Sequence, residues 1–505
     1  MGFLMNLSYS LLITTLISCC SFIVTVEGVI GINWGRQTTH RLIPSMVVDL
    51  LLQNDIRHLK LFSPSDNVLK AFASSGIAIT TTLPNEGLGD IKYPGMAAFW
   101  LQERIRKFQN QGVNIRYIHV GSEPFSTYYR NKTYDATAVA LRLIQDAIIS
   151  LGYDTLTATT PHFTDVLNPD VGKPSEADFR PDLKDKMVEL IRLLNRTNAP
   201  FVMSMFPIYS VINHTDWDVE FSFVDNKSNF TIEDNGLIYR NVFEFVYDSF
   251  LHALAKAGFP DMQLGVGKIG WPTDGYPGAN IANAERFYRE FLPYIKSNKG
   301  TPLRPGISID VFVHSLSDEN MNKVDMAAFQ RHWGVYWSNG QPKYKIDFTG
   351  QGRDIFPTTA KGVIMMPKRW CIFNDDTRNL TKVKEQLTVA CRRADCTTLS
   401  PGGSCSHLDF NGNVSYGFNM LFQAKAQSDF NGSTCDYDGL GKLVPNDPSV
   451  GTCKFPVEIL AAEKADRDGL TSGGIRNSFP GFSFGTTLLF VIAFDIVVGT
   501  YLELW

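Results

Sequence analysis

Two side chains of opposite charge follow predicted strands and have the types needed for acid–base chemistry. Glu123 lies three residues after an apolar run, between glycine and proline in residues 120–125. A carboxylate fixed just past a strand is a candidate general acid, and the alternative is a glutamate that begins a helix before Pro124. Lys268 ends a second apolar run and leads into the turn Gly270-Trp271-Pro272. The sequence therefore offers a carboxylate and an amine as candidate site residues.

The elements that must position these side chains alternate between short apolar runs and amphipathic stretches. Strands are predicted at 29–34, 58–62, 77–83, 115–120, 155–160, 201–206, 263–268 and 307–313. Helices are predicted at 45–53, 68–74, 97–109, 134–151, 182–194, 239–257 and 283–296. This α/β alternation predicts a (β/α)₈ TIM barrel over residues 29–350. A doubly wound open sheet is the alternative, although no Gly-x-Gly-x-x-Gly follows the first strand.

In such a barrel the side chains that end each strand gather at one face, where barrel enzymes carry out their chemistry. The predicted strand ends supply Asn33, Trp34, Phe62, Asn85, Glu123, His162, Phe206, Lys268 and His314.

Composition and cysteine spacing limit the function classes. The net charge of -4 over 505 residues gives no basic surface for nucleic acid, and no motif calls for a metal or cofactor. Six cysteines lie within 370–455, and they predict a small disulfide-rich module in a secreted chain. A zinc site is the alternative, but paired C-x-x-C spacing with histidines is missing. Fifteen pairings remain open. The cysteines are Cys371, Cys391, Cys396, Cys405, Cys435 and Cys453.

The N-terminus predicts secretion. Residues 11–26 are apolar and flanked by small residues, as in a signal peptide, here placed at 1–28. Acceptor sequons agree with that compartment. They lie at Asn131, Asn195, Asn213, Asn226, Asn229, Asn379, Asn413 and Asn431.

The C-terminus predicts a lipid anchor. An apolar stretch, 482–502, follows the small residues Ser472-Gly473-Gly474, an order typical of a GPI-attachment signal. Ser472 is the predicted attachment site, with Gly473 and Asn477 as alternatives, and 473–505 would be removed. A transmembrane helix is the other interpretation, which Asp495 disfavours. We expect a secreted protein held at the outer face of the plasma membrane, facing the cell wall.

The large domain resembles the plant endo-β-1,3-glucanases, glycoside hydrolases of family 17. The resemblance spans nearly the whole domain in the expected order. It rests on residues 31–35, 60–62, 120–125, 270–275, 299–306, 318–320 and 331–334.

The resemblance implies a retaining mechanism on β-1,3-glucan. One Glu after the fourth strand is the acid/base, and a second Glu ending the seventh strand is the nucleophile, about 5–5.5 Å away. Glu123 matches the acid/base, but Lys268 stands at the nucleophile position. The family's Asn before the acid/base is Ser122 here, and its Asn and Tyr after the sixth strand are Ser204 and Phe206.

A second departure lies near the eighth strand, where Asn322 replaces a family Lys while Glu319 is retained. The resemblance implies glucan contacts, with Trp34, Phe125 and Trp271 as stacking faces; the alternative is that these rings belong to the core. The implied glucan-binding set is Asn33, Trp34, Ser122, Phe125, Phe206, Trp271 and Glu319.

Residues 370–455 resemble the plant carbohydrate-binding module of family 43, which also implies β-1,3-glucan binding. The matching residues include Trp370-Cys371, Gly402-Gly403-Ser404-Cys405 and 415–419. Tyr416, Phe418 and Phe422 alternate, which predicts one face of a strand, the alternative being the module's core. Residues 351–369 are predicted as a linker and 456–472 as a spacer to the anchor.

Three functional hypotheses follow. An ammonium cannot attack an anomeric carbon, and beside Glu123 it favours the carboxylate, which cannot donate a proton. The first hypothesis is therefore a non-catalytic β-1,3-glucan binder at the cell surface. The alternatives are an active retaining endo-β-1,3-glucanase, with Glu123 as acid/base, and a module that serves only as a protein-interaction surface.

Overall fold

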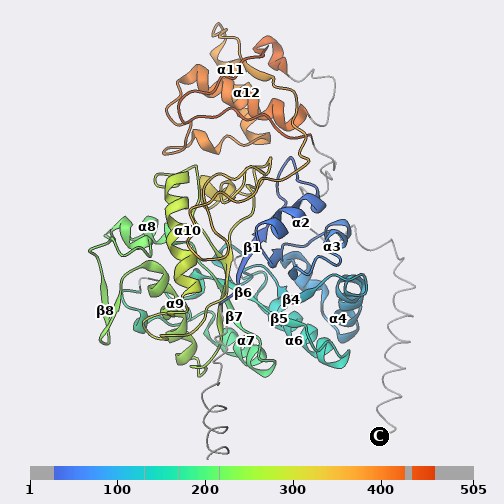
Figure 1. Cartoon of the computed structure of the whole chain (residues 1–505), viewed down its shortest axis with the longest axis vertical. Helices are drawn as coiled ribbons and strands as arrows, with labels where there is room; N and C mark the ends of the chain where they lie inside the picture. Colours follow the sequence, from blue (N-terminus) through green and yellow to red (C-terminus); the bar gives the residue numbers. More distant parts are fainter. Residues whose placement is uncertain (1–27, 130, 170, 215, 427–434, 461–505) are drawn as a thin grey trace, which may run out of the picture.

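The computed structural model describes residues 28–129, 131–169, 171–214, 216–426 and 435–460. They form a barrel and a smaller module stacked on one end of it (Figure 1). The predictions for the signal peptide up to residue 27, for Asn431, for Ser472 and for the segment 461–505 lie outside these residues.

The strands of the large domain form one parallel sheet that closes on itself. Neighbours follow the order β5-β4-β3-β2-β1-β11-β10-β7-β6. β5 and β6 are successive pieces of one strand, separated only by Thr160, so the ring has eight strand positions. The predicted TIM barrel is confirmed, and the open sheet is excluded because the first strand pairs with the last. The strands are β1 (Ile30–Trp34), β2 (His58–Leu61), β3 (Ala78–Leu83), β4 (Ile115–Val120), β5 (Thr157–Thr159), β6 (Pro161–Phe163), β7 (Phe201–Ser204), β10 (Leu264–Ile269) and β11 (Val311–Val313).

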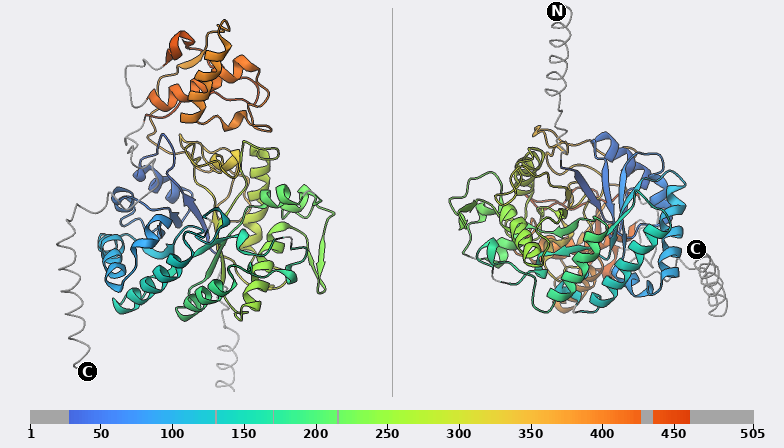
Figure 2. Two further views of the ribbon diagram at one scale, coloured as in Figure 1. Left: turned by 180° about the vertical axis from the view of Figure 1, so that it is seen from behind. Right: turned by 90° about the horizontal axis from the view of Figure 1, so that it is seen from below.

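Helices surround the strands, as the view from below in Figure 2 shows. Local capping sets where some of them begin. The Asn241 side chain accepts a hydrogen bond from the Glu244 amide (3.0 Å), so α9 begins at Val242, three residues after the predicted start. The helices are α2 (Pro44–Gln53), α3 (Asp66–Ala71), α4 (Pro94–Leu101), a π-helical turn (Gln102–Arg106), α5 (Lys107–Gln109), α6 (Tyr134–Ser150), α7 (Lys184–Arg196), α9 (Val242–Lys256) and α10 (Ile281–Lys296).

An insertion after β7 contains elements that the periodicity did not predict. The predicted strand 201–206 ends at Ser204, since Pro207 begins the helix α8 (Pro207–Asn213). Further on, β8 (Ile232–Asp234) and β9 (Leu237–Tyr239) form an antiparallel hairpin. Asn235 and Gly236 both have positive φ at its turn, so the Asn-Gly pair was the sequence signal for it.

The C-terminal module packs two helices, α11 (Leu380–Arg393) and α12 (Phe410–Ala426), against a two-stranded sheet, β12 (Trp370–Phe373) and β13 (Gly441–Val444). All six predicted cysteines form disulfides, and the zinc alternative is therefore wrong. The pairs are Cys371–Cys435, Cys391–Cys396 and Cys405–Cys453.

The predicted strand through Tyr416, Phe418 and Phe422 is wrong, because all three lie in α12. Their exposed fractions are 3%, 0% and 2%, which confirms the alternative that they are core residues. Phe418 and Phe422 are four residues apart, the spacing that puts side chains on one helix face. A Cβ on Gly417 would lie 2.5 Å from Leu387 Cδ1, so this glycine lets α11 pack closely on α12.

The segments on either side of the module are packed against the barrel. The Thr358 amide donates to Asn54 Oδ1 (2.7 Å) and the Met366 amide to the Glu458 carbonyl (2.9 Å). Glu458 Oε2 also lies 2.9 Å from His40 Nδ1, and both side chains are buried. The prediction that a spacer begins at 456 is therefore wrong for 456–460. Within the described ranges, no helix has both the length and the apolar character needed to cross a bilayer.

Candidate active site

Glu123 stands at the C-terminal end of β4 on a constrained turn. Its φ is 53°, a left-handed conformation that is uncommon for a residue with a side chain and that clusters at functional sites. The Asn85 side chain holds the preceding peptide, donating to the Ser122 carbonyl (3.0 Å) and accepting from the Ser122 amide (2.8 Å). Gly121 leaves room for this clamp, since a Cβ there would lie 2.9 Å from Asn85 Oδ1.

Lys268 reaches Glu123 from β10. The register between β10 and β7 shifts after Val266, which places Lys268 opposite Ser204. Lys268 Nζ lies 3.0 Å from Glu123 Oε1, and the two side chains are only 12% and 19% exposed. The structure therefore brings together the two residues that the sequence placed on separate strands, and they form an ion pair.

The protonation of Glu123 follows from this pair. Burial raises the pKa of Glu123, but the Lys268 ammonium and the Ser204 hydroxyl outweigh burial, and the pKa falls below its ordinary value. The side chain is consequently a carboxylate at neutral pH and has no proton to give to a leaving group.

A second amine, Lys60, lies inside the barrel on β2. Its side chain is completely buried. Lys60 Nζ and Lys268 Nζ lie 5.1 Å and 5.3 Å from the centre of the Phe62 ring, within cation–π distance. Burial, together with the charge of Lys268, lowers the pKa of Lys60 well below its ordinary value. Sequence reasoning missed Lys60 as a site residue, although a lysine within an apolar run was the signal for it.

Three buried histidines lie near these charged groups. Burial lowers the pKa of His119 and His314 well below the ordinary value, and the charges of Lys60 and Lys268 add to the effect. Burial lowers the pKa of His162 to about 3. These imidazoles are therefore neutral and add no positive charge beside Glu123.

Three predicted stacking faces are not available to a sugar. Trp34, Phe125 and Trp271 are exposed by 3%, 0% and 1%. The Trp271 ring stacks on Phe223 at 4.7 Å between ring centres, and Phe125 stacks on Tyr134 at 5.2 Å. The prediction that they stack on glucan is wrong, and the core alternative holds.

Phe206 is half-buried beside the site, against the ring of Trp333 at 4.5 Å and that of His314 at 5.4 Å. The Phe206 ring also lies 6.2 Å from the ring of Tyr209. The Tyr209 hydroxyl accepts a hydrogen bond from Gln330 Nε2 (2.6 Å). Burial raises the pKa of Tyr209 and the charge of Glu123 raises it further. Tyr209 is thus a phenol near Glu123 that the predicted set lacked.

Asn33 and Glu319 are held by the scaffold. Asn33 is fully buried and donates from Nδ2 to the Gly267 carbonyl (3.2 Å). Glu319 Oε1 accepts from the Gln37 amide (2.8 Å). Burial raises the pKa of Glu319 despite that bond and the charge of Lys268. In the part of the chain that the structure describes, no three His, Cys, Asp or Glu side chains are grouped to hold a metal ion.

The closed eight-stranded barrel, with Glu123 after β4 and Lys268 facing it from β10, has its candidate site at the face where barrel enzymes carry out their chemistry. The chain belongs to glycosyl hydrolases family 17, whose sequence model matches residues 30–348, and an X8 domain matches residues 369–442.

Relatives match this chain over most of their length. The chain is 37% identical over 443 residues to glucan endo-1,3-beta-glucosidase 8 of Arabidopsis thaliana, covering 87% of this chain and 91% of that protein. It is 38% identical over 451 residues to glucan endo-1,3-beta-glucosidase 5 of the same plant, covering 88% and 91%.

A solved structure matches about two thirds of the chain. CJP38, a beta-1,3-glucanase and allergen of Cryptomeria japonica pollen, superposes with a TM-score of 0.60 at 28% identity, covering 63% of this chain and 98% of that one.

Proposed function

We propose that this protein binds β-1,3-glucan at the cell surface through its barrel and its C-terminal module, without hydrolysing it. The observation that carries the proposal is the ion pair between Lys268 Nζ and Glu123 Oε1 at 3.0 Å. The side chain that faces Glu123 is thus an amine, where a retaining glycosidase needs a second carboxylate.

A retaining mechanism needs a nucleophile and a proton donor, and this pair of side chains supplies neither. An ammonium has no lone pair with which to attack the anomeric carbon, so no glycosyl-enzyme intermediate forms. Glu123, held as a carboxylate by the same ammonium, cannot protonate the leaving oxygen. Glu319 is a poor substitute nucleophile, because it is 9% exposed and its raised pKa favours the neutral acid. Losing one member of a catalytic pair removes several orders of magnitude of rate.

Family membership supports the choice of ligand. The relatives are named glucan endo-1,3-beta-glucosidases, and the chain covers about nine tenths of their length. Phe206, Tyr209 and Ser122 are partly exposed around Glu123 and offer an aromatic edge and hydroxyls to a sugar. The proposed ligand is therefore the β-1,3-glucan named for the relatives, and the hydrolysis named for them is not proposed for this chain.

The proposed location is the outer face of the plasma membrane. Residues 1–28 act as the signal peptide and Ser472 as the GPI-attachment site. Three disulfides in the module support an oxidising compartment. The sequons at Asn131, Asn195, Asn226 and Asn379 lie on exposed side chains, as glycan acceptors must.

The test is laminarin hydrolysis measured beside laminarin binding. Residues 29–460, produced through a eukaryotic secretory pathway, include the packed segment 456–460. We expect calorimetry to detect binding while a reducing-end assay shows no turnover above buffer. Hydrolysis that disappears in E123Q would contradict the proposal and favour the active endo-glucanase that the relatives' names suggest. Absence of binding would contradict it as well.

The variant K268E isolates the effect of the amine. It places two carboxylates side by side, so the pKa of Glu123 should rise and the acid form should reappear. We expect no more than weak laminarin hydrolysis, since Ser204 and Phe206 remain. The matched control is K268Q, which removes the charge without supplying a nucleophile and should stay inactive. Full family-like activity in K268E would mean that Lys268 alone silences the site.

A further inference from the structure

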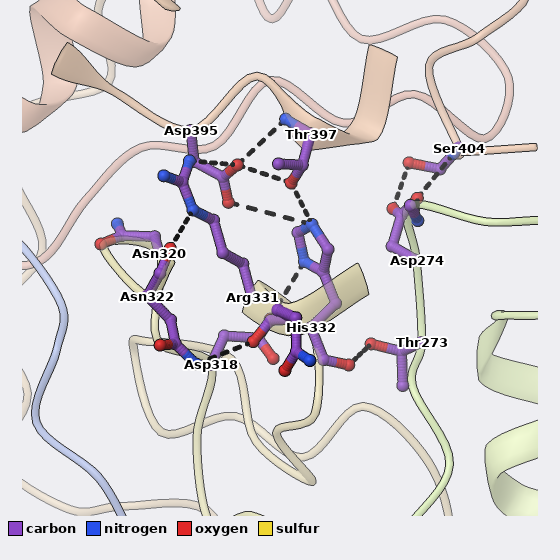
Figure 3. A network of polar contacts seen from close by, with 12 residues as sticks. Thr273, Asp274, Asp318, Asn320, Asn322, Arg331, His332, Asp395, Thr397 and Ser404 are labelled. Carbon is purple, nitrogen blue, oxygen red and sulfur yellow. Dashed lines mark hydrogen bonds and ion pairs between the residues drawn. The ribbon is translucent and has the colours of Figure 1, made fainter. Parts of the chain in front are cut away.

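The segment 318–332, which follows β11, contacts the C-terminal module through Arg331 and His332 (Figure 3). Arg331 Nη1 donates to Asp395 Oδ1 of the module (3.1 Å), and the two side chains are 16% and 6% exposed. The carboxylate of Asp395 is fixed in turn by the amide (3.0 Å) and hydroxyl (2.6 Å) of Thr397. The module therefore presents a preset acceptor to the barrel.

The same guanidinium also donates a hydrogen bond to the loop that follows β11, residues 318–326. Arg331 Nε donates to the Asn322 carbonyl (2.9 Å). Asn322 closes the loop through its amide, which donates to the Glu319 carbonyl (2.9 Å), and through Nδ2, which donates to the Gln330 carbonyl (3.2 Å). A charge of the module is thus linked by one side chain to the backbone of a barrel loop.

This loop reaches across the barrel. The Tyr128 hydroxyl donates to Asp325 Oδ2 (2.9 Å) and accepts from Lys323 Nζ (3.4 Å). Tyr128 follows β4 and Asp325 follows β11, which are four positions apart in a ring of eight. Loops that follow opposite strands of a barrel can meet only over its end.

The crossing stands next to the candidate active site. Tyr128 is five residues beyond Glu123 on the same loop. Its neighbour Tyr129 is close enough to Glu123 that the carboxylate adds to burial in raising the pKa of Tyr129 to about 12. The bridge from Tyr128 to Asp325 therefore crosses the end of the barrel at which Glu123 lies.

We infer that Asp395 is a positioning residue for the barrel's cleft. Through Arg331 it holds residues 318–326 over the mouth, so that the glucan occupies a covered groove, one wall of which depends on the module. The ligand in this inference rests on the proposed function. The order of the loop does not, and it can be measured without ligand.

The experiment compares D395N with D376N in the full chain, produced through a eukaryotic secretory pathway. D395N keeps the shape of the side chain and removes the charge that Arg331 needs. D376N removes another carboxylate that pairs with an arginine of the same module, Arg378, and its described contacts stay within the module. We expect amide hydrogen exchange in residues 318–326 to rise about tenfold in D395N and to remain unchanged in D376N. Unchanged exchange in D395N would overturn the inference.

A coupling measurement separates positioning from simple docking of the module. Y128F removes the far end of the bridge and does not touch Asp395. If both act through the loop, laminarihexaose affinity in D395N/Y128F should equal that of the weaker-binding single variant, each single variant losing about five- to tenfold. Strictly additive losses would overturn the inference. If the unaltered chain binds no laminarihexaose, the proposed function fails, and hydrogen exchange alone decides the role of Asp395.

Discussion

The Glu123 carboxylate lies 3.0 Å from the Lys268 ammonium, with both side chains largely removed from water. The Lys268 ammonium and the Ser204 hydroxyl together stabilise the ionised acid by more than burial destabilises it, and the pKa of Glu123 therefore falls. The backbone of Glu123 has a left-handed conformation, which is uncommon for a residue with a side chain and which clusters at functional sites. The backbone turn therefore fixes the position of the carboxylate, and the neighbouring ammonium favours its ionised form.

Removing the carboxylate should destabilise the protein at neutral pH. E123Q leaves Lys268 mostly buried beside a neutral amide, and we expect the free energy of unfolding to fall by about 1–3 kcal/mol. Because the folded-state pKa of Glu123 is lowered, its contribution is complete above the ordinary value of 4.5 and is lost as pH falls through the folded pKa. Urea unfolding of E123Q and of the unaltered chain from pH 3 to 7 measures both the loss of stability at neutral pH and its decrease as the pH falls.

The control for that experiment is the double variant E123Q/K268M, which removes the unpaired cation and should recover part of the lost stability. An E123Q variant as stable as the unaltered chain at pH 7 would show that the pair contributes nothing.

At the scale of the elements, the barrel and the module are held by different means. The barrel strands are stabilised by parallel pairing and a large apolar core. The module has a small core around α11 and α12 and three disulfides. Chains of this size that cannot bury a large core depend on such cross-links.

The three disulfides should not contribute equally. Cys371–Cys435 spans 64 residues and Cys391–Cys396 spans 5. Chain-entropy estimates are about 4 kcal/mol for the longer loop and about 2 kcal/mol for the shorter. Replacing both cysteines by alanine should therefore lower the thermal midpoint of the module more for 371/435 than for 391/396. Calorimetry measures this, and equal or reversed shifts would contradict the entropic explanation.

At the scale of the whole molecule, the module sits on loops that follow β10 and β11 (Figure 1). Asp274, after β10, accepts hydrogen bonds from the amide (2.7 Å) and hydroxyl (2.5 Å) of Ser404. His332, after β11, contacts the Thr397 hydroxyl at 2.6 Å and lies 3.9 Å from both Asp318 and Asp395. The interface is polar and charged and is therefore sensitive to pH.

Raising the pH should loosen this interface. Burial opposes the protonation of His332, but the nearby carboxylates of Asp318 and Asp395 raise its pKa above 6.5. A raised folded-state pKa contributes stability that is complete below 6.5 and is lost as pH rises through the folded value. The difference in thermal midpoint between the unaltered chain and H332Q should therefore shrink from pH 6 to pH 9.

H252Q is the matched control, since burial lowers the pKa of His252 on α9 and its effect on stability must run in the opposite direction. A pH-independent difference for H332Q would mean that His332 contributes through its neutral contacts alone.

Much of this architecture could be predicted from local patterns. Alternation of apolar runs and amphipathic stretches gave eight strands, since a buried parallel strand needs a continuous apolar run. The sequence also indicated that a carboxylate and an amine lie at the ends of predicted strands, and that six cysteines lie within one module. These features depend on residue type and spacing, which are complete in the sequence.

Packing partners were decided only by the tertiary structure. A flat ring such as that of Trp271 can stack on Phe223 or on a sugar, so the sequence motif alone does not distinguish a core residue from a cleft residue. Lys60 and His119 joined the site because the barrel closes, and Asp395 reached Arg331 because the module docks. Contacts between residues far apart in the chain depend on the relative placement of whole elements, which local periodicity does not contain.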